Sequence, residues 1–186
     1  MTFRAFISVD VGDRLDWHAL RRELADVDRG VRPVRTDQLH LTLRFLGDTE
    51  EGKVEDLKDL MAGAVEGVEP FRLTFEGVGA FPNARRARVV WIGLLGAEPL
   101  VQVARRLEEG VVAMGWRPEK RSFRPHATVA RVKHLRRHER LGSLLERWRD
   151  RSFGSMEVRA IHLKSSDLRP EGAVYSTVHT QDLGRP

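Results

Sequence analysis

The sequence predicts an α+β protein with two lobes, each a mainly antiparallel sheet with helices on its outer face, related by a pseudo-two-fold axis around a central cleft. Two observations support this fold class. Residues 1–84 and 85–172 show the same order of strand-like and helix-like segments. Each half also carries one His-x-Thr motif in an apolar run, and the two histidines, His40 and His126, lie 86 residues apart. A repeat this long indicates a duplicated lobe and not a solenoid.

Five elements are expected in the first half, in the order strand, helix, strand, helix, strand. Alternating apolar residues predict the strands, and apolar residues three or four positions apart predict the helices. The expected ranges are 4–10, 13–28, 38–46, 50–66 and 71–78. The apolar stripe of the first helix is Trp17, Leu20, Leu24 and Val27, and that of the second is Val54, Leu57, Leu60, Met61 and Ala64.

The second half repeats this order. The expected elements are a strand over 88–95, a helix from Pro99, a motif strand at His126, a helix from about Arg136 and a strand over 153–163. Proline suits the first turn of a helix, and residues 96–99 mark the crossing between halves. A closing strand over 173–181 completes one lobe, so we expect one two-lobed domain over residues 1–186.

The two His-x-Thr motifs are the strongest functional signal. With 7 histidines in 186 residues, composition alone would supply about 0.3 such pairs by chance. A strand places residues i and i+2 on one face, roughly 7 Å apart, so each motif offers an imidazole and a hydroxyl together. If the motif strands face each other across the cleft, the two pairs converge on one phosphate.

This residue set suits the opening of a cyclic phosphodiester. Histidine titrates near neutrality, so one imidazole can act as base while another acts as acid. Threonine hydroxyls can donate to the non-bridging oxygens. Two histidines without nearby carboxylates are too few ligands for a metal centre, so we expect no metal and no cofactor. The residues alone leave open which histidine is the acid.

Composition and charge set limits on the environment and partners. The chain has no cysteine, which excludes a disulfide framework and a thiol nucleophile. Net charge is +5 and 27 of the 32 basic residues are arginine, which favours a polyanionic partner such as RNA but also fits an ordinary solvated surface. The longest apolar run, residues 89–95, is too short for a membrane span. We therefore expect a cytoplasmic protein without a membrane partner, and a monomer.

Arginines near the motifs are further candidates. Arg131 would bind the phosphate only if a bulge or strand end turned it to the face of His126, because strict alternation places it opposite. Phe45, on the face away from His40 by the same alternation, is interpreted as core. Candidate contacts to an RNA backbone are Arg85, Arg86, Arg88, Arg121 and Arg124.

Several blocks of the chain resemble the two-histidine phosphoesterase superfamily, and within it the RNA 2′,3′-cyclic phosphodiesterases, also called 2′-5′ RNA ligases. The blocks are residues 4–10, 40–47, 81–91, 123–131, 163–166 and 172–175, in family order across nearly the whole chain. Both His-x-Thr motifs are intact.

The resemblance implies metal-independent hydrolysis of a terminal RNA 2′,3′-cyclic phosphate to a 2′-phosphomonoester. It implies His40 as proton donor, His126 as proton acceptor, and Thr42, Thr128 and Arg131 as phosphate ligands. The same pair acting in reverse would support 2′-5′ RNA ligation. Two alternatives remain: a cyclic phosphodiesterase of small nucleotides, and a non-catalytic domain that binds RNA ends.

Overall fold

The computed structural model describes residues 1–170 and 172–184, so the expected domain over 1–186 includes three residues, 171, 185 and 186, outside the described part. The strands are β1 (Thr2–Asp10), β2 (Val31–Pro33), β3 (His40–Glu50), β4 (Phe71–Phe81), β5 (Val89–Leu95), β6 (His126–Val132), β7 (Ser152–Val158), β8 (Ala160–Arg169) and β9 (Gly172–Asp182). The α-helices are α1 (His18–Val27), α2 (Val54–Val65), α3 (Glu98–Ala113) and α4 (His138–Arg147). In the described part of the chain, no helix has the length and apolar character needed to cross a membrane.

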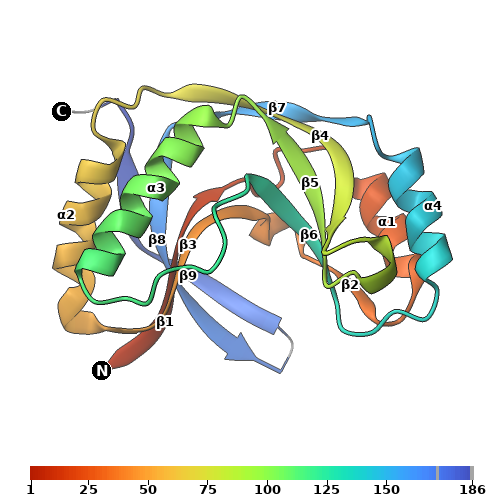
Figure 1. The fold of residues 1–186 in the computed structure, drawn as a ribbon, viewed down its shortest axis with the longest axis horizontal. Coiled ribbons are helices and arrows are strands. Elements are labelled where there is room, and N and C mark those ends of the chain that lie inside the picture. The colour runs from red at the N-terminus through yellow and green to blue at the C-terminus, as the bar shows by residue number, and fades with distance from the viewer. Residues whose placement is uncertain (171, 185–186) are drawn as a thin grey trace.

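Two antiparallel sheets form the framework, which confirms the predicted α+β class. One has the strand order β3-β1-β8-β9 and the other β2-β6-β5-β4-β7. Helices α2 and α3 pack against each other beside the first sheet, and α1 and α4 contact each other beside the second. In Figure 1 the two helix pairs lie at opposite ends of the molecule, with the motif strands β3 and β6 between them.

Each sheet combines strands from both halves of the chain. Strand β4, from the first half, pairs with β5 along residues 74–81, and β8, from the second half, pairs with β1 along residues 5–8. The boundary between residues 84 and 85 therefore does not separate the two sheets. The buried apolar residues of each sheet therefore come from strands of both halves.

The predicted strand over residues 153–163 is wrong, because the chain changes sheet inside it. Strand β7 pairs with β4, whereas β8 pairs with β1 in the other sheet. Met156 and Val158 are buried and so are Ile161 and Leu163, so the spacing of two becomes three at the crossing. That break in alternation marks the point where a different face turns to the core.

The first helix begins later than expected, at His18 and not at residue 13. The preceding loop is held by backbone hydrogen bonds. The N–H groups of Val11 and Gly12 donate to the carbonyl of Leu39 at 3.0 and 2.8 Å, and the N–H of Asp16 donates to the carbonyl of Phe153 at 3.2 Å. The first two bonds attach the loop to the residue directly before His40, and the third attaches it to β7.

A buried arginine ties β3 to the loop that leads into β6. The side chain of Arg44 is 5% exposed. Its guanidinium forms ion pairs with Glu108 of α3 at 2.6 Å and with Glu119 at 2.7 Å. It also donates to the carbonyls of Arg117 at 2.7 Å and Phe45 at 2.8 Å. Apart from Phe45, these partners lie on one helix and one loop, so a single cation fixes their position relative to β3.

We expect Arg44→Met to lower the free energy of unfolding by about 2 kcal/mol, because two backbone carbonyls lose their donor inside the protein. Urea unfolding followed by tryptophan fluorescence measures this change. Arg105→Met on α3 is the matched control, since Arg105 forms an exposed ion pair with Glu109. Its effect should stay within about 0.5 kcal/mol. Equal losses in the two variants would contradict the anchoring role of Arg44.

Candidate active site

The two motif strands are buried in the same pattern. In both β3 and β6 the first four residues alternate between half-buried and buried. The fourth and fifth residues are both buried, and the sixth is exposed. His40, Thr42, His126 and Thr128 are all half-buried, and the residues between them are in the core. Each histidine therefore shares a face with its threonine, and that face retains access to solvent.

A β-bulge interrupts each motif strand at the same place. Opposite β1, Ser8 pairs with Thr42 and Ile7 with Arg44, so Leu43 is the extra residue. Opposite β5, the register skips Val129 in the same way. An extra residue reverses the alternation that follows it, so the side chains beyond each bulge change face.

The bulges bring Phe45 and Arg131 to the face of the histidines. The interpretation of Phe45 as core is wrong: its side chain is 54% exposed and its ring centroid lies 6.2 Å from that of Phe6. For Arg131, the bulge that a phosphate-binding role requires is present, and its charge acts on His40. The two motif strands thus present different third groups, an aromatic ring on β3 and a cation on β6.

Both imidazoles are oriented by the same backbone contact. The Nδ1 atom of His40 lies 2.8 Å from the carbonyl oxygen of Gln38, and Nδ1 of His126 lies 2.6 Å from that of Arg124. A carbonyl oxygen only accepts, so Nδ1 carries the proton in each ring. Each Nε2 is then left to accept a proton when the ring is neutral and to donate one when it is charged.

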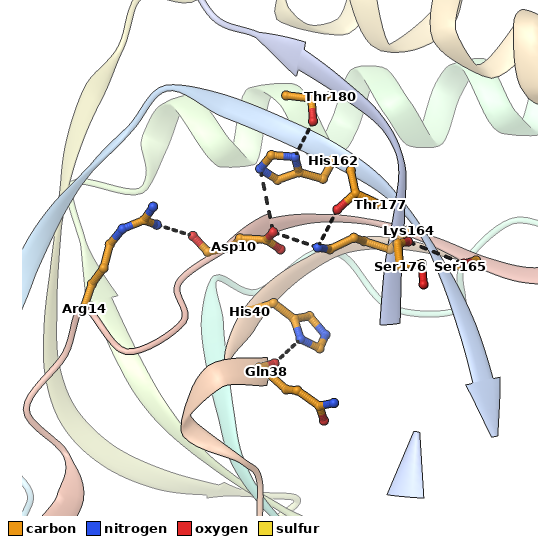
Figure 2. A network of polar contacts seen from close by, with 10 residues as sticks. All are labelled: Asp10, Arg14, Gln38, His40, His162, Lys164, Ser165, Ser176, Thr177 and Thr180. Atoms are coloured by element: carbon orange, nitrogen blue, oxygen red, sulfur yellow. Dashed lines mark hydrogen bonds and ion pairs between the residues drawn. The ribbon is translucent and has the colours of Figure 1, made fainter. Parts of the chain in front are cut away.

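Two aromatic rings and an ionic network surround His40. Its ring centroid lies 5.1 Å from that of Phe6 and 5.2 Å from that of Tyr175, the latter edge-on. Figure 2 shows the network beside it, in which Lys164 donates to Asp10 at 2.7 Å and to Thr177 at 3.0 Å. The Asp10 carboxylate also lies 4.0 Å from Nε2 of His162.

Burial lowers the pKa of the His40 imidazole below its usual value. The carbonyl of Gln38 and the carboxylate of Asp10 oppose this shift, and the charges of Arg131 and Lys164 add to it. Burial likewise lowers the pKa of His162. Free of substrate, His40 is therefore held toward its neutral form, with three charged groups close enough to influence it.

His126 has aromatic neighbours and lies apart from that network. Phe81 contacts it edge-on at 5.1 Å between centroids, and Trp91 lies 5.3 Å from Phe81. Gly79 makes room for this arrangement, since a Cβ atom there would lie 2.2 Å from the Trp91 ring. Gly79 thus allows Trp91 to pack against Phe81, and Phe81 in turn contacts the His126 ring.

Two cavities adjoin β3. One of about 480 Å³ is lined by His40 together with Asp10, Lys164 and Tyr175. The other, of about 590 Å³, is lined by Phe45, Trp116 and basic residues of the loop before β6, including Arg121. The candidate RNA contacts Arg85, Arg86, Arg88, Arg121 and Arg124 are all exposed, the first two on the 3-10 turn η3 (Ala84–Arg86).

Sequence reasoning missed Asp10 and Lys164, which line the cavity beside His40, and Arg44, which holds the loop before β6. Lys164 and Asp10 lie on neighbouring strands, β8 and β1, whose pairing crosses the two halves of the chain. Nothing local in the sequence indicates that pairing. The conspicuous signal for Arg44 is a charged residue inside an otherwise apolar strand.

Two sheets that each carry a His-x-Thr strand, with both imidazoles oriented through Nδ1, define a protein of the two-histidine phosphoesterase class. Residues 8–169 match the model of the 2′-5′ RNA ligase superfamily. The chain belongs to this superfamily.

Curated relatives cover nearly the full length. A protein of Methanothermobacter thermautotrophicus named RNA 2′,3′-cyclic phosphodiesterase is 39% identical, covering 95% of this chain and 96% of that relative. A protein of the same name from Archaeoglobus fulgidus is 38% identical, covering 92% and 96%. Among solved structures, TT0787 of Thermus thermophilus matches with a TM-score of 0.74 and 30% identity over 97% of each chain. E. coli LigT complexed with 3′-AMP shares the fold, with a TM-score of 0.74 at 24% identity over 100% of each chain.

Opposite shifts are expected when the two partners of the Asp10–Lys164 pair are removed. Lys164→Met should raise the pKa of His40, because an opposing positive charge is lost and the Asp10 carboxylate is left unpaired. Asp10→Asn should lower it further, because the supporting negative charge is lost. NMR titration of the histidine ring protons measures both shifts without any substrate. Lys58→Met, on α2 in an ion pair with Glu55, should leave the His40 titration unchanged. Shifts of the same sign in the two site variants would refute this account.

Proposed function

We propose that this protein hydrolyses the terminal 2′,3′-cyclic phosphate of RNA to a 2′-phosphomonoester through general acid–base catalysis by His40 and His126. The observation that carries the proposal is that the two imidazoles are held in the same way. Each is held through Nδ1 by the carbonyl two residues earlier, on a strand with the same bulge. Full-length relatives named RNA 2′,3′-cyclic phosphodiesterase support the same substrate.

In this mechanism the histidines act on opposite sides of the phosphorus. Nε2 of neutral His126 accepts a proton from water as the water oxygen forms its bond to phosphorus. The bond between phosphorus and the ribose 3′ oxygen breaks, and Nε2 of protonated His40 donates its proton to that oxygen. The product keeps the phosphate on the 2′ oxygen. No step uses a metal ion or a cofactor.

Thr42, Thr128 and Arg131 bind the non-bridging oxygens in this proposal. The two hydroxyls stand beside the histidines on the same strand faces, and Arg131 is turned to that side by the bulge at Val129. Hydrogen bonds and a fixed positive charge stabilise the negative charge that gathers on these oxygens in the transition state. The phosphate in turn offsets the burial of His40, since an adjacent anion favours the imidazolium form.

The exposed arginines Arg85, Arg86, Arg88, Arg121 and Arg124 are proposed as contacts to the RNA backbone. We propose that the protein acts as a cytoplasmic monomer, without a membrane partner, in which residues 1–84 and 85–172 form two related repeats. The same histidine pair, with a 5′ hydroxyl in place of water as the nucleophile that attacks the cyclic phosphate, would give 2′-5′ ligation, because the 3′ oxygen again leaves and the phosphate joins the 2′ and 5′ oxygens.

Two other functions would use the same cleft. A non-catalytic domain for RNA ends would gain affinity from permanently charged residues at positions 40 and 126, where this chain has two titratable imidazoles. A phosphodiesterase of small cyclic nucleotides uses the same site chemistry. Such an enzyme differs from the proposed one only in that its substrate has no further nucleotides attached to the one that carries the cyclic phosphate.

Removing either imidazole should reduce turnover by about 10²-fold or more, because each supplies one proton transfer. The assay follows a short RNA with a 2′,3′-cyclic phosphate end on a gel, comparing His40→Ala and His126→Ala with the parent protein. His18→Ala, an exposed histidine on α1, is the matched control. Turnover should also survive EDTA. Loss of activity in EDTA would indicate a metal enzyme, and full activity in both site variants would refute the proposed catalysis.

The pH dependence should differ between free and bound protein. His40 must be protonated to act as acid, so activity falls as pH rises through its pKa. Burial lowers that pKa in the free protein, whereas bound phosphate raises it. We therefore expect the high-pH limb of kcat to lie at higher pH than that of kcat/KM. Coincident limbs would show that the substrate does not change the ionisation of His40.

A further inference from the structure

Three segments, residues 28–33, 84–88 and 131–140, meet to form one continuous surface. The N–H of Lys133 donates to the carbonyl of Gly30 at 3.0 Å, and the N–H of Val132 donates to that of Arg88 at 2.9 Å. The approach is close, because a Cβ atom on Gly30 would lie 1.9 Å from the carbonyl oxygen of His134. The three segments therefore hold fixed positions relative to one another.

This surface carries ten exposed basic side chains, which we call the basic surface. They are Arg29, Arg32, Arg85, Arg86, Arg88, Arg131, Lys133, Arg136, Arg137 and Arg140. The three segments contain only two acidic residues, Asp28 and Glu139. Asp28 is occupied by backbone groups, since its carboxylate accepts from the N–H groups of Gly30 at 3.0 Å and of Arg136 at 2.9 Å.

No side chain of the basic surface forms an ion pair with a carboxylate within the described part of the chain. Elsewhere in that part ten lysine and arginine side chains do. They are Arg35, Arg44, Lys53, Lys58, Arg105, Arg147, Arg149, Arg159, Lys164 and Arg169. Within the three segments, the positive charge is therefore not neutralised by ion pairs with carboxylates of the protein itself. Such a region attracts a polyanion.

The basic surface is continuous with the candidate active site through Arg131. Arg131 pairs across the sheet with Arg32 of β2 on one side and with Val89 of β5 on the other. The same residue belongs to the face of His126 and Thr128. A chain of phosphates leaving the site past Arg131 would therefore meet the other basic side chains next.

We propose that the basic surface binds the backbone phosphates of RNA upstream of its cyclic end, so that the contact extends from Arg131 to the exposed arginines of residues 136–140. This inference rests on the proposed function and extends its contacts to the RNA backbone from Arg85, Arg86 and Arg88 to the whole basic surface. Phosphate contacts made by arginine add affinity without sequence preference and weaken as salt rises.

The test compares two substrates, 2′,3′-cyclic AMP and an RNA of about twelve nucleotides with the same cyclic end. The parent protein should show a KM for the RNA that is lower by about tenfold or more. The variant Arg136→Gln/Arg137→Gln/Arg140→Gln should lose most of that advantage, with kcat for the RNA and turnover of the mononucleotide little changed.

A control of equal charge is Arg105→Gln/Arg149→Gln/Arg159→Gln, three exposed arginines that each pair with a glutamate outside the basic surface. It should keep the RNA advantage. Equal KM values for the two substrates in the parent protein, or equal losses in the two triple variants, would overturn the proposal.

A binding measurement separates this inference from the proposed function. Fluorescence anisotropy with a labelled RNA that ends in a 3′-phosphate needs no turnover. The slope of log affinity against log salt should be smaller by about two in the Arg136/Arg137/Arg140 variant. If the parent protein hydrolyses neither substrate but this slope change is seen, the surface is an RNA site and the catalytic proposal fails. An unchanged slope overturns the surface proposal whatever the activity.

Discussion

The bulges directly after the two His-x-Thr motifs, at Leu43 and Val129, determine which side chains the candidate site contains. Without the bulges at Leu43 and Val129, strict alternation would turn Phe45 and Arg131 away from the histidines. The bulge also places two buried residues in succession, which is how Arg44 enters the protein interior on the side opposite the site. From there Arg44 holds the loop that precedes His126. The bulge at Leu43 in β3 thus also affects the loop that leads into β6, because it turns Arg44 toward that loop.

The two motif strands match in geometry but differ in their surroundings. His40 lies beside an ion pair formed between two neighbouring strands, whereas His126 rests on Phe81 and, through it, on Trp91. An acid and a base with identical environments would have no reason to differ in protonation at a given pH. In this protein burial lowers the pKa of His40, so its proposed role as donor depends on the bound phosphate, whose negative charge favours the imidazolium form.

The sequence predicted the features that depend on local pattern. The motif strands, the helical stripes and the shared face of each histidine and threonine follow from periods of 2 and 3.6, because those periods decide which side chains meet the core. It did not predict features that depend on pairing between distant segments. Strict alternation predicts Phe45 in the core, because the bulge that turns it outward is visible only in the pairing with β1. The division of residues 153–163 into two strands is likewise visible only in their pairing with β4 and β1. Lys164 reaches the site through the same long-range pairing.

The exchange of β4 and β8 between sheets has a consequence for any shortened chain. Residues 1–84 alone would contribute β1 and β3 to one sheet and β2 and β4 to the other, where β5 and β7, the partners of β4, and β6, the partner of β2, would be absent. Unpaired edges of this kind recruit a second chain. A polypeptide of half this length could therefore reach the same architecture as a dimer whose subunits exchange the strand that corresponds to β4.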